Sequence, residues 1–258
     1  MEWDSLENMA SEARDKGITI GQLIFKREVD FSGKSEEEIF SQMAYSWQVM
    51  KEAVQEGSRN PRPSRSGMIG GDGKKLLEYI EKGEPLSGDC LKGVALSLSV
   101  AELNAAMGKI VAAPTAGSSG IIPGVLQAVS LRLNKSDEDV IYSLFTAAGV
   151  GMIIADKASL AGAEGGCQAE CGSAAAMAAA AAVELAGGTP AQAVNAVAIS
   201  MKNNLGLVCD PVAGLVEVPC AKRNALGAAN ALVAADLALA GIKSVIPADE
   251  FIAAMGEV

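Results

Sequence analysis

An alanine-rich stretch near the middle of the chain most strongly limits the folds open to it. Residues 174–193 contain 11 alanines in 20 positions. Alanine has the highest helix propensity, and its small side chain also lets helix axes approach closely or leaves room for a cofactor between them. Alternating strand patterns are nearly absent, with Ile18-Thr19-Ile20 as the one short candidate. We therefore expect an all-α fold, a compact multi-helix domain with a buried Ala/Gly-rich core.

Capping signals place several of these helices. Ser35 with Glu38, and Ser136 with Asp139, have capping-box spacing, which predicts helices over about 35–55 and 136–159. Thr189-Pro190 predicts another helix start, with proline in the first turn. Further helices are expected over about 73–82, 89–111, 168–186, 221–240 and 247–258.

Charge is distributed unevenly along the chain. Residues 1–90 hold 12 of the 21 basic and 17 of the 31 acidic side chains, whereas residues 140–241 hold only 11 charged residues. A loop rich in Arg, Pro, Ser and Gly, from Ser58 to Gly73, is the best internal boundary. We interpret 1–258 as a single domain, in which 1–60 form a polar helical outer layer and 73–258 a core that carries the chemistry.

Composition excludes several classes of function. The net charge of −10 makes a nucleic-acid partner unfavourable, because no basic surface can be assembled from this balance. The chain has no histidine, which removes Ser-His-Asp and Cys-His nucleophiles, histidine-ligated zinc and a histidine base from this chain. Few aromatic residues argue against a stacking platform for bases or sugars.

The cysteines and the start of the chain indicate a compartment. Five cysteines cannot all pair with one another, and the start Met1-Glu2-Trp3-Asp4 lacks the basic and apolar regions of a secretory signal. We expect reduced thiols and a cytoplasmic protein. No apolar run in the sequence approaches the roughly 18–20 residues that span a bilayer, so no membrane is expected.

Four cysteines gather in the low-charge half. Cys167, Cys171, Cys209 and Cys220 lie within 54 residues, and two of them adjoin proline-containing segments that cannot be regular helix. Two interpretations stay open at this point: a thiolate-only metal site, and buried cysteines that only pack. The spacing is neither a CxxC pair nor the compact run of ferredoxins.

Two further features are candidates for binding or catalysis. The small-residue loop Pro114–Gly124 precedes a helical pattern, and such a loop either binds a carboxylate or phosphate or simply caps a helix. Lys157 and Lys202 are rare cations in the apolar half. They are ordinary helix-end lysines or, if burial lowers their pKa, candidate bases.

Three strings together resemble a known family. Pro114–Gly124, Gly162–Ser173, and Lys202 through Asp210-Pro211 to Asn224 are similar to the alpha chain of iron–sulfur-dependent bacterial L-serine dehydratase (L-serine ammonia-lyase). The likeness runs from about residue 3 to the end and is most specific over 112–230. It implies a helical chain around a [4Fe–4S] cluster site, independent of pyridoxal phosphate. A beta chain completes the enzyme, as part of a homo- or hetero-oligomer.

The resemblance also implies roles for individual residues. Cys167, Cys209 and Cys220 would hold the cluster and leave one iron open, with Cys171 a nearby packing thiol and Cys90 an ordinary buried residue. The substrate L-serine would be bound by Thr115, Ser118, Ser119, Gly120 and Asn204. Lys157 and Lys202 remain the candidate bases beside a group from the beta chain.

The resemblance leaves alternatives and one departure. The same chemistry would serve an L-cysteine desulfidase, whereas an electron-transfer or redox-sensing protein would need a fourth protein ligand. A helical subunit whose cysteines only pack is a further alternative. The chain ends at Val258, before a tail that family members usually carry, so we expect a shortened chain without a tail-borne cysteine ligand.

Overall fold

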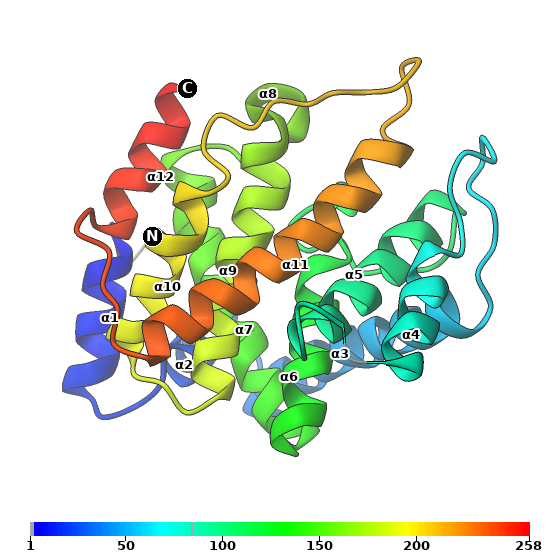
Figure 1. The fold of residues 1–258 in the computed structure, drawn as a ribbon. Coiled ribbons are helices and arrows are strands. Elements are labelled where there is room, and N and C mark those ends of the chain that lie inside the picture. Colours follow the sequence, from blue (N-terminus) through cyan, green and yellow to red (C-terminus); the bar gives the residue numbers. More distant parts are fainter. Residues whose placement is uncertain (1–2, 84) are drawn as a thin grey trace.

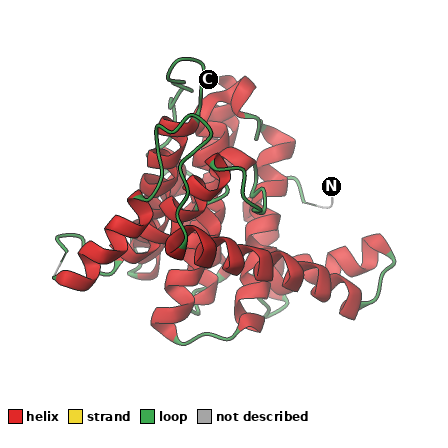
Figure 2. Ribbon diagram, turned by 90° about the vertical axis from the view of Figure 1, so that its right-hand side faces the viewer, coloured by secondary structure: helices red, strands yellow, loops and turns green. Residues whose placement is uncertain are grey.

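The computed structural model describes residues 3–83 and 85–258 and confirms the all-α fold. Met1, Glu2 and Glu84, and with them the first two residues of the acidic start, lie outside this description. Helices and loops make up the described chain, without a strand (Figure 2). The helices are α1 Leu6–Asp15, α2 Ile20–Ser32, α3 Glu36–Arg59, α4 Asp72–Lys82, α5 Cys90–Ala105, η1 Ala116–Ser118, α6 Ile121–Leu133, α7 Asp137–Lys157, α8 Gly162–Cys167, η2 Gln168–Gly172, α9 Ser173–Leu185, α10 Pro190–Lys202, α11 Glu217–Leu239 and α12 Ala248–Glu257.

The alanine-rich helix α9 occupies the centre of the molecule (Figure 1). It packs against α6, α7, α10 and α11, and every residue from Ser173 to Val183 is buried. Small side chains allow these contacts: Gly151 of α7 leaves room for Met177, and Gly227 of α11 leaves room for Ile121. The predicted Ala/Gly-rich core is therefore confirmed as the packing centre of the fold.

The predicted capping signals are present as hydrogen bonds. Ser35 with Glu38, Ser136 with Asp139, and Thr189 with Gln192 form reciprocal capping boxes at the starts of α3, α7 and α10. Each box satisfies backbone N–H groups that a helix start otherwise leaves unpaired. The expected starts of these helices are confirmed to within one residue.

Four sequence expectations need correction. The segment at Pro219-Cys220 was expected outside regular helix, but it lies in the first turn of α11, where proline is tolerated. The strand at Ile18–Ile20 is wrong, because Thr19 is instead the N-cap of α2 in a fourth capping box. The helix expected over 89–111 ends at Ala105, two residues before Met107 takes a positive φ of 61°. The helix expected from 168 begins with a π-helical turn, Gln168–Gly172, before regular α-helix resumes.

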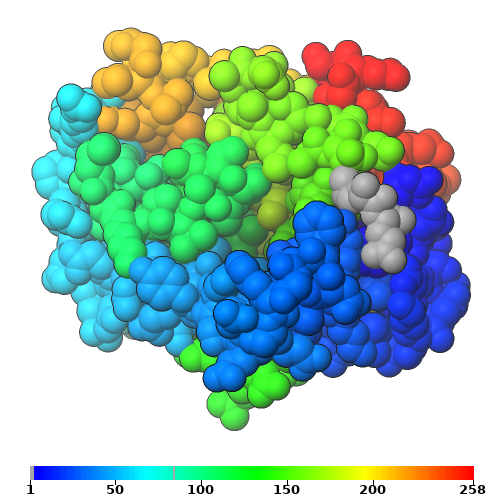
Figure 3. Space-filling model, turned by 180° about the vertical axis from the view of Figure 1, so that it is seen from behind, coloured from blue at the N-terminus to red at the C-terminus, as the bar shows by residue number. Residues whose placement is uncertain are grey.

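The N-terminal helices cover one side of the core. Residues of α1–α3, in blue, spread over the lower part of the face in Figure 3. Their inner faces are apolar: Met9, Ile24 and Trp47 are buried. The loop 60–71 is bonded to the start of α11, because Ser66 donates to Glu217, and Lys222 forms an ion pair with Asp72 of α4.

One helix is longer and more apolar than the sequence inspection suggested. Among the described residues, α7 alone has the length and composition to cross a membrane. However, 67% of its most apolar window is buried inside the protein. Core helices show the same combination of length, composition and burial, so this feature is weak evidence for a membrane span.

Candidate functional site

The π-helical turn η2 brings the first cysteine pair to a distant loop. Gly166 has φ 68°, and a Cβ atom there would lie 3.0 Å from the Leu207 carbonyl oxygen. Gln168 N–H donates to that oxygen at 2.9 Å, and its side-chain oxygen accepts from Gly206 N–H at 2.8 Å. The segment from α8 into η2 is thereby attached to loop 203–216, which crosses the top of Figure 1 in gold. π-Turns occur frequently at functional sites.

Three thiols meet at this place. The thiols of Cys171 and Cys220 both donate hydrogen bonds to the sulfur of Cys167. These bonds, together with the nearby Arg223 guanidinium, lower the pKa of Cys167. The pKa values of Cys171 and Cys220 are raised, because each donates its proton to Cys167 and is partly desolvated.

Arg223 links the loop that carries the fourth thiol, Cys209, to the other three. Its guanidinium contacts Cys167, donates to the Val208 carbonyl oxygen and pairs with Asp210 at 2.9 Å. Cys209 lies between these two loop residues, is exposed, and is close enough to Cys220 to act on it electrostatically. The structure thus brings Cys167 and Cys220 into contact and places Cys209 at the edge of the cluster.

The chemistry of this donor set fits an iron–sulfur cluster. Iron–sulfur centres prefer thiolate ligands to imidazole or carboxylate ligands. Over residues 3–83 and 85–258, no group of three or more His, Cys, Asp or Glu side chains has the closed geometry of a metal site. Cys209 is the exposed member of the predicted set, on the loop 203–216. Whether Cys209 can bind the same cluster as Cys167 and Cys220 therefore depends on the position of loop 203–216.

The small-residue loop lies beside the thiols because Asn224 connects the two. Asn224 is fully buried, one helical turn after Cys220. Its amide nitrogen donates to the carbonyl oxygens of Gly117, at 2.6 Å, and Cys220, at 2.7 Å. Its oxygen accepts from Gly120 N–H at 2.9 Å. The predicted neighbourhood of loop and cysteines is thus built by one side chain of α11.

Within the loop, the accessible groups differ from those expected. Ser118, Ser119 and Gly120 are buried, and the N–H groups of Ser119 and Gly120 already donate to protein oxygens. Ala116 is exposed and Thr115 and Gly117 are half-buried. In the described part of the chain, the N–H groups of Ala116 and Gly117 have no acceptor. The rim from Thr115 to Gly117 is therefore the part of the loop that can meet a ligand.

Glu170 faces this rim from the π-turn. Thr115 Oγ1 donates to Glu170 Oε1 at 2.8 Å. A Cβ atom on Gly117 or Gly162 would fall within 3.0 Å of a carboxyl oxygen of Glu170, so both glycines make room for that side chain. The half-buried carboxylate consequently lies between the small-residue loop and the cysteine-bearing turn.

The remaining predicted residues lie elsewhere. Lys157 is exposed at the end of α7 and pairs with Asp156 at 3.4 Å, and Lys202 is exposed at the end of α10. The burial expected for these two lysines is not found. Asn204 is half-buried against Gly172, but its amide nitrogen donates to the Ser200 carbonyl oxygen and so caps its own helix.

Sequence inspection missed three residues that organise the site. These are Arg223 and Asn224, near the start of the last long helix, and Glu170, for which the sequence predicts no role. Polar residues within a low-charge segment were the available signal, because buried polar groups need partners. Apart from the contact of Asn224 with Cys220, their partners are 13 to 107 residues away in sequence, which no local pattern reveals.

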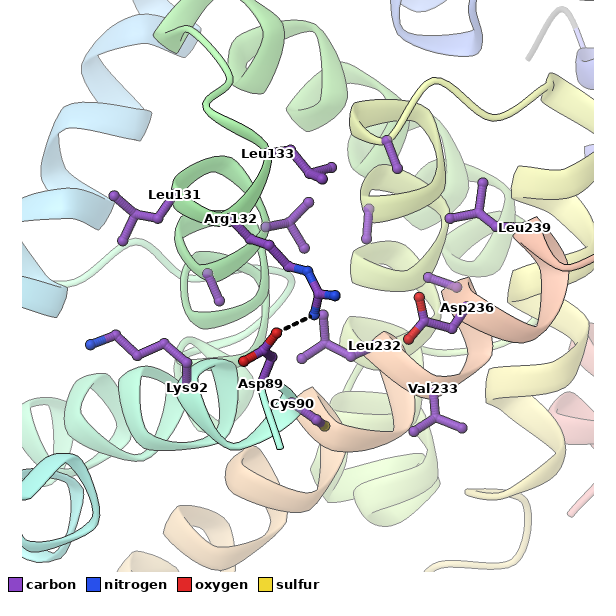
Figure 4. Close-up of a pocket in the computed structure, with 15 residues that line it drawn as sticks. Asp89, Cys90, Lys92, Leu131, Arg132, Leu133, Leu232, Val233, Asp236 and Leu239 are labelled. Carbon is purple, nitrogen blue, oxygen red and sulfur yellow. Dashed lines mark ion pairs between the residues drawn. The ribbon is translucent and has the colours of Figure 1, made fainter. Parts of the chain in front are cut away.

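A cavity away from these residues is a separate feature. It has a volume of about 560 Å³ and lies between α5, α6, α9 and α11 (Figure 4). Its lining is mostly apolar, with Asp89 and Arg132 paired across it at 2.8 Å. Half-buried Cys90 lines this cavity, where burial raises the pKa of its thiol. None of the predicted site residues does so.

Known proteins resemble this chain over nearly its whole length. The family described as "Serine dehydratase alpha chain" matches residues 15–258. The chain is 52% identical to the "Probable L-serine dehydratase, alpha chain" of Bacillus subtilis over 97% of this chain and 84% of that protein. It is 48% identical to the "L-serine dehydratase, alpha chain" of Peptoniphilus asaccharolyticus over 95% and 84%. It is also 36% identical to the longer "L-serine dehydratase 1" of Escherichia coli, over 91% of this chain and 53% of that protein.

Proposed function

The chain belongs to the serine dehydratase alpha-chain family, and from that premise we propose that it is the catalytic alpha chain of an L-serine dehydratase. The reaction removes the Cα proton and the 3-hydroxyl of L-serine as water. The resulting aminoacrylate tautomerises and hydrolyses to pyruvate and ammonia. The observation that carries the proposal is the meeting of the cysteine-bearing turn with the small-residue loop, in a chain 52% identical to an alpha chain of this name.

We assign Cys167, Cys209 and Cys220 as the ligands of a [4Fe–4S] cluster. When bound, a cluster with three protein ligands supplies an open iron that acts as a Lewis acid toward the hydroxyl leaving group. Arg223 supports this role, because it holds Val208 and Asp210 on both sides of Cys209 while contacting Cys167. The thiolate donors and the buried position of Cys167 support the assignment.

The rim Thr115–Gly117 is suited to the substrate carboxylate. The free N–H groups of Ala116 and Gly117 belong to the same short turn, Ala116–Ser118. Adjacent backbone donors of this kind bind anions. Asn224 holds this turn in place by hydrogen bonds to the Gly117 carbonyl oxygen and the Gly120 N–H group. Donors held in place before the reaction stabilise the charge that develops on the carboxylate as the Cα proton leaves.

The proton acceptor is better supplied by a second chain. Lys157 and Lys202 are exposed, and no described contact joins either of them to the thiols or to the loop. This chain matches only about half of the longer E. coli relative. This supports the proposal that a partner, the beta chain, provides the remaining part of the enzyme. We propose that this chain binds such a partner at the rim of the site.

Anaerobic co-purification tests the proposed function. The chain is expressed with candidate beta chains, and pyruvate formation from L-serine is measured before and after exposure to air. We expect activity in the anaerobic complex, loss of activity in air together with loss of visible absorption, and recovery after reconstitution with iron and sulfide. Activity that survives complete loss of iron would contradict the cluster assignment, whereas absence of pyruvate from the iron-loaded complex would contradict the function.

A further inference from the structure

Glu170 has no cation partner although it lies in the most organised part of the molecule. Its carboxylate is half-buried, and within the described ranges no lysine or arginine lies within ion-pair distance of it. Its one hydrogen-bond donor is the Thr115 hydroxyl, at 2.8 Å. Partly buried carboxylates without a counter-charge are costly, so a functional reason for this one is expected.

The surroundings of Glu170 are built to hold its carboxylate in one place. Gly117 and Gly162 both leave the space that the carboxyl group fills, since a Cβ on either would come as close as 2.4 to 2.9 Å to Oε2. Glu170 also lies in the π-turn Gln168–Gly172, which is hydrogen-bonded to loop 203–216. A π-turn rotates its side chains relative to a regular helix, which here directs Glu170 to the loop rather than along α9.

The carboxylate and the free N–H groups of the rim have complementary charge. The N–H groups of Ala116 and Gly117 attract an anion, and the Glu170 carboxylate beside Gly117 attracts a cation. A zwitterionic α-amino acid carries both charges on groups attached to the same carbon. A simple carboxylic acid has only the first and would be repelled by Glu170.

From this geometry we infer that Glu170 binds the α-ammonium group of the substrate and so selects amino acids over hydroxy acids. The inference rests on the proposed function, because it concerns the same loop and the same substrate class. Thr115 acts as a positioning residue, since its hydroxyl fixes one carboxyl oxygen of Glu170 and leaves the other free for the ammonium group.

Binding to the reconstituted enzyme tests this inference. Because the enzyme converts L-serine, the dissociation constant of L-serine is taken from the concentration dependence of single-turnover rates. That of 3-hydroxypropionate, which lacks only the amino group, is taken from calorimetry. Both are measured in the wild type and in Glu170→Gln. We expect L-serine binding to weaken about 10- to 100-fold in the variant, the range for one lost hydrogen bond to a charged group. Binding of 3-hydroxypropionate should stay the same or improve. Glu170→Asp, which restores the charge, should recover part of the L-serine affinity.

Controls separate this role from others. Glu164→Gln removes an exposed carboxylate of α8 that accepts only from Ser159, and it should leave both affinities unchanged. Unchanged L-serine affinity in Glu170→Gln, or equal weakening of both ligands, would overturn the inference. A loss of kcat with an unchanged dissociation constant would also overturn it, because that pattern belongs to a base. Pyruvate formation by the wild type is measured separately, so failure of the proposed function is recognised independently.

Discussion

Helix α9 and the site region differ in how their structure is determined. α9 is buried from Ser173 to Val183 and has no polar side chain from Ala174 to Val183, so its position depends on shape. The site region comprises the turn Ala116–Ser118, the π-turn Gln168–Gly172, the loop 203–216 and the first two turns of α11. There, individual polar contacts between distant segments fix the backbone. The core therefore tolerates polar change least, and the site region depends on single side chains.

Replacing a thiol of the site region should have the largest effect on activity. Cys220→Ser removes a proposed cluster ligand and the donor to Cys167, and we expect activity to fall by more than about 100-fold, since even residues that only support ligands cost 10- to 100-fold. Pyruvate formation measures this. Cys90→Ser, in the cavity between α5 and α11, is the matched control and should retain activity. Equal activity in both variants would remove the distinction between proposed ligand cysteines and packing cysteines.

Asn224→Ala should cause the largest loss of stability among the variants of the site region. It leaves the Gly117 carbonyl and the Gly120 N–H without their partner inside the protein. Each unsatisfied buried group costs about 1–3 kcal/mol, so we expect a loss of about 2–6 kcal/mol for the two groups. Denaturant unfolding measures the change. Asn203→Ala, at the exposed end of α10, should cost less than about 1 kcal/mol, and comparable losses would show that Asn224 has no special role.

Ala180→Leu tests the core half of the comparison. Ala180 is fully buried in α9, and a larger side chain there should cost about 1–3 kcal/mol through overpacking. The expected signature is reduced thermal stability with little change in the KM for L-serine. Ala191→Leu, in an exposed first-turn position of α10, provides the control. Higher or unchanged stability of Ala180→Leu would mean that the core around α9 is loosely packed.

The acid dependence of the contact between α4 and α11 should be the smallest effect. Hydrogen bonds from Lys222 and Lys75 lower the pKa of Asp72. A carboxyl with a lowered folded-state pKa stabilises the fold above its unfolded value of about 3.9, and this contribution is lost as pH falls through the folded value.

Because the Asp72 side chain is 35% exposed, solvent screening limits the contribution to less than about 1 kcal/mol. Asp72→Asn should therefore lower stability slightly at neutral pH and remove this part of the acid dependence, as followed by unfolding at several pH values. Asp15→Asn, in an exposed pair with Arg14, is the control. An identical pH profile in wild type and Asp72→Asn would contradict the assignment.

The two regions also differ in how far sequence predicts them. The capping boxes of α3, α7 and α10 and the buried course of α9 follow from local patterns, because their determinants lie within a few residues. The π-turn is not visible in the sequence, since it depends on Gln168 binding Leu207 and Gly206. The orientation of Glu170 and the buried role of Asn224 depend on contacts 55 and more than 100 residues away.

The same reason explains the errors within the site. Ser118, Ser119 and Gly120 have the right composition for anion binding, but the next helix and Asn224 bury them. Lys157 and Lys202 lie in an apolar part of the sequence, yet both are at helix ends that reach the surface. Sequence identifies which segments carry polar groups, whereas the packing of segments decides which groups remain accessible.

Iron and sulfide content per chain tests the central claim most directly. The protein is purified anaerobically with its partner, and the wild type is compared with Cys167→Ser, Cys209→Ser, Cys220→Ser and Cys90→Ser. Three thiolates sharing one cluster predict about four irons and four sulfides in the wild type and in Cys90→Ser, with most of both lost in each of the other variants. Undiminished iron in Cys167→Ser, Cys209→Ser and Cys220→Ser would contradict the claim.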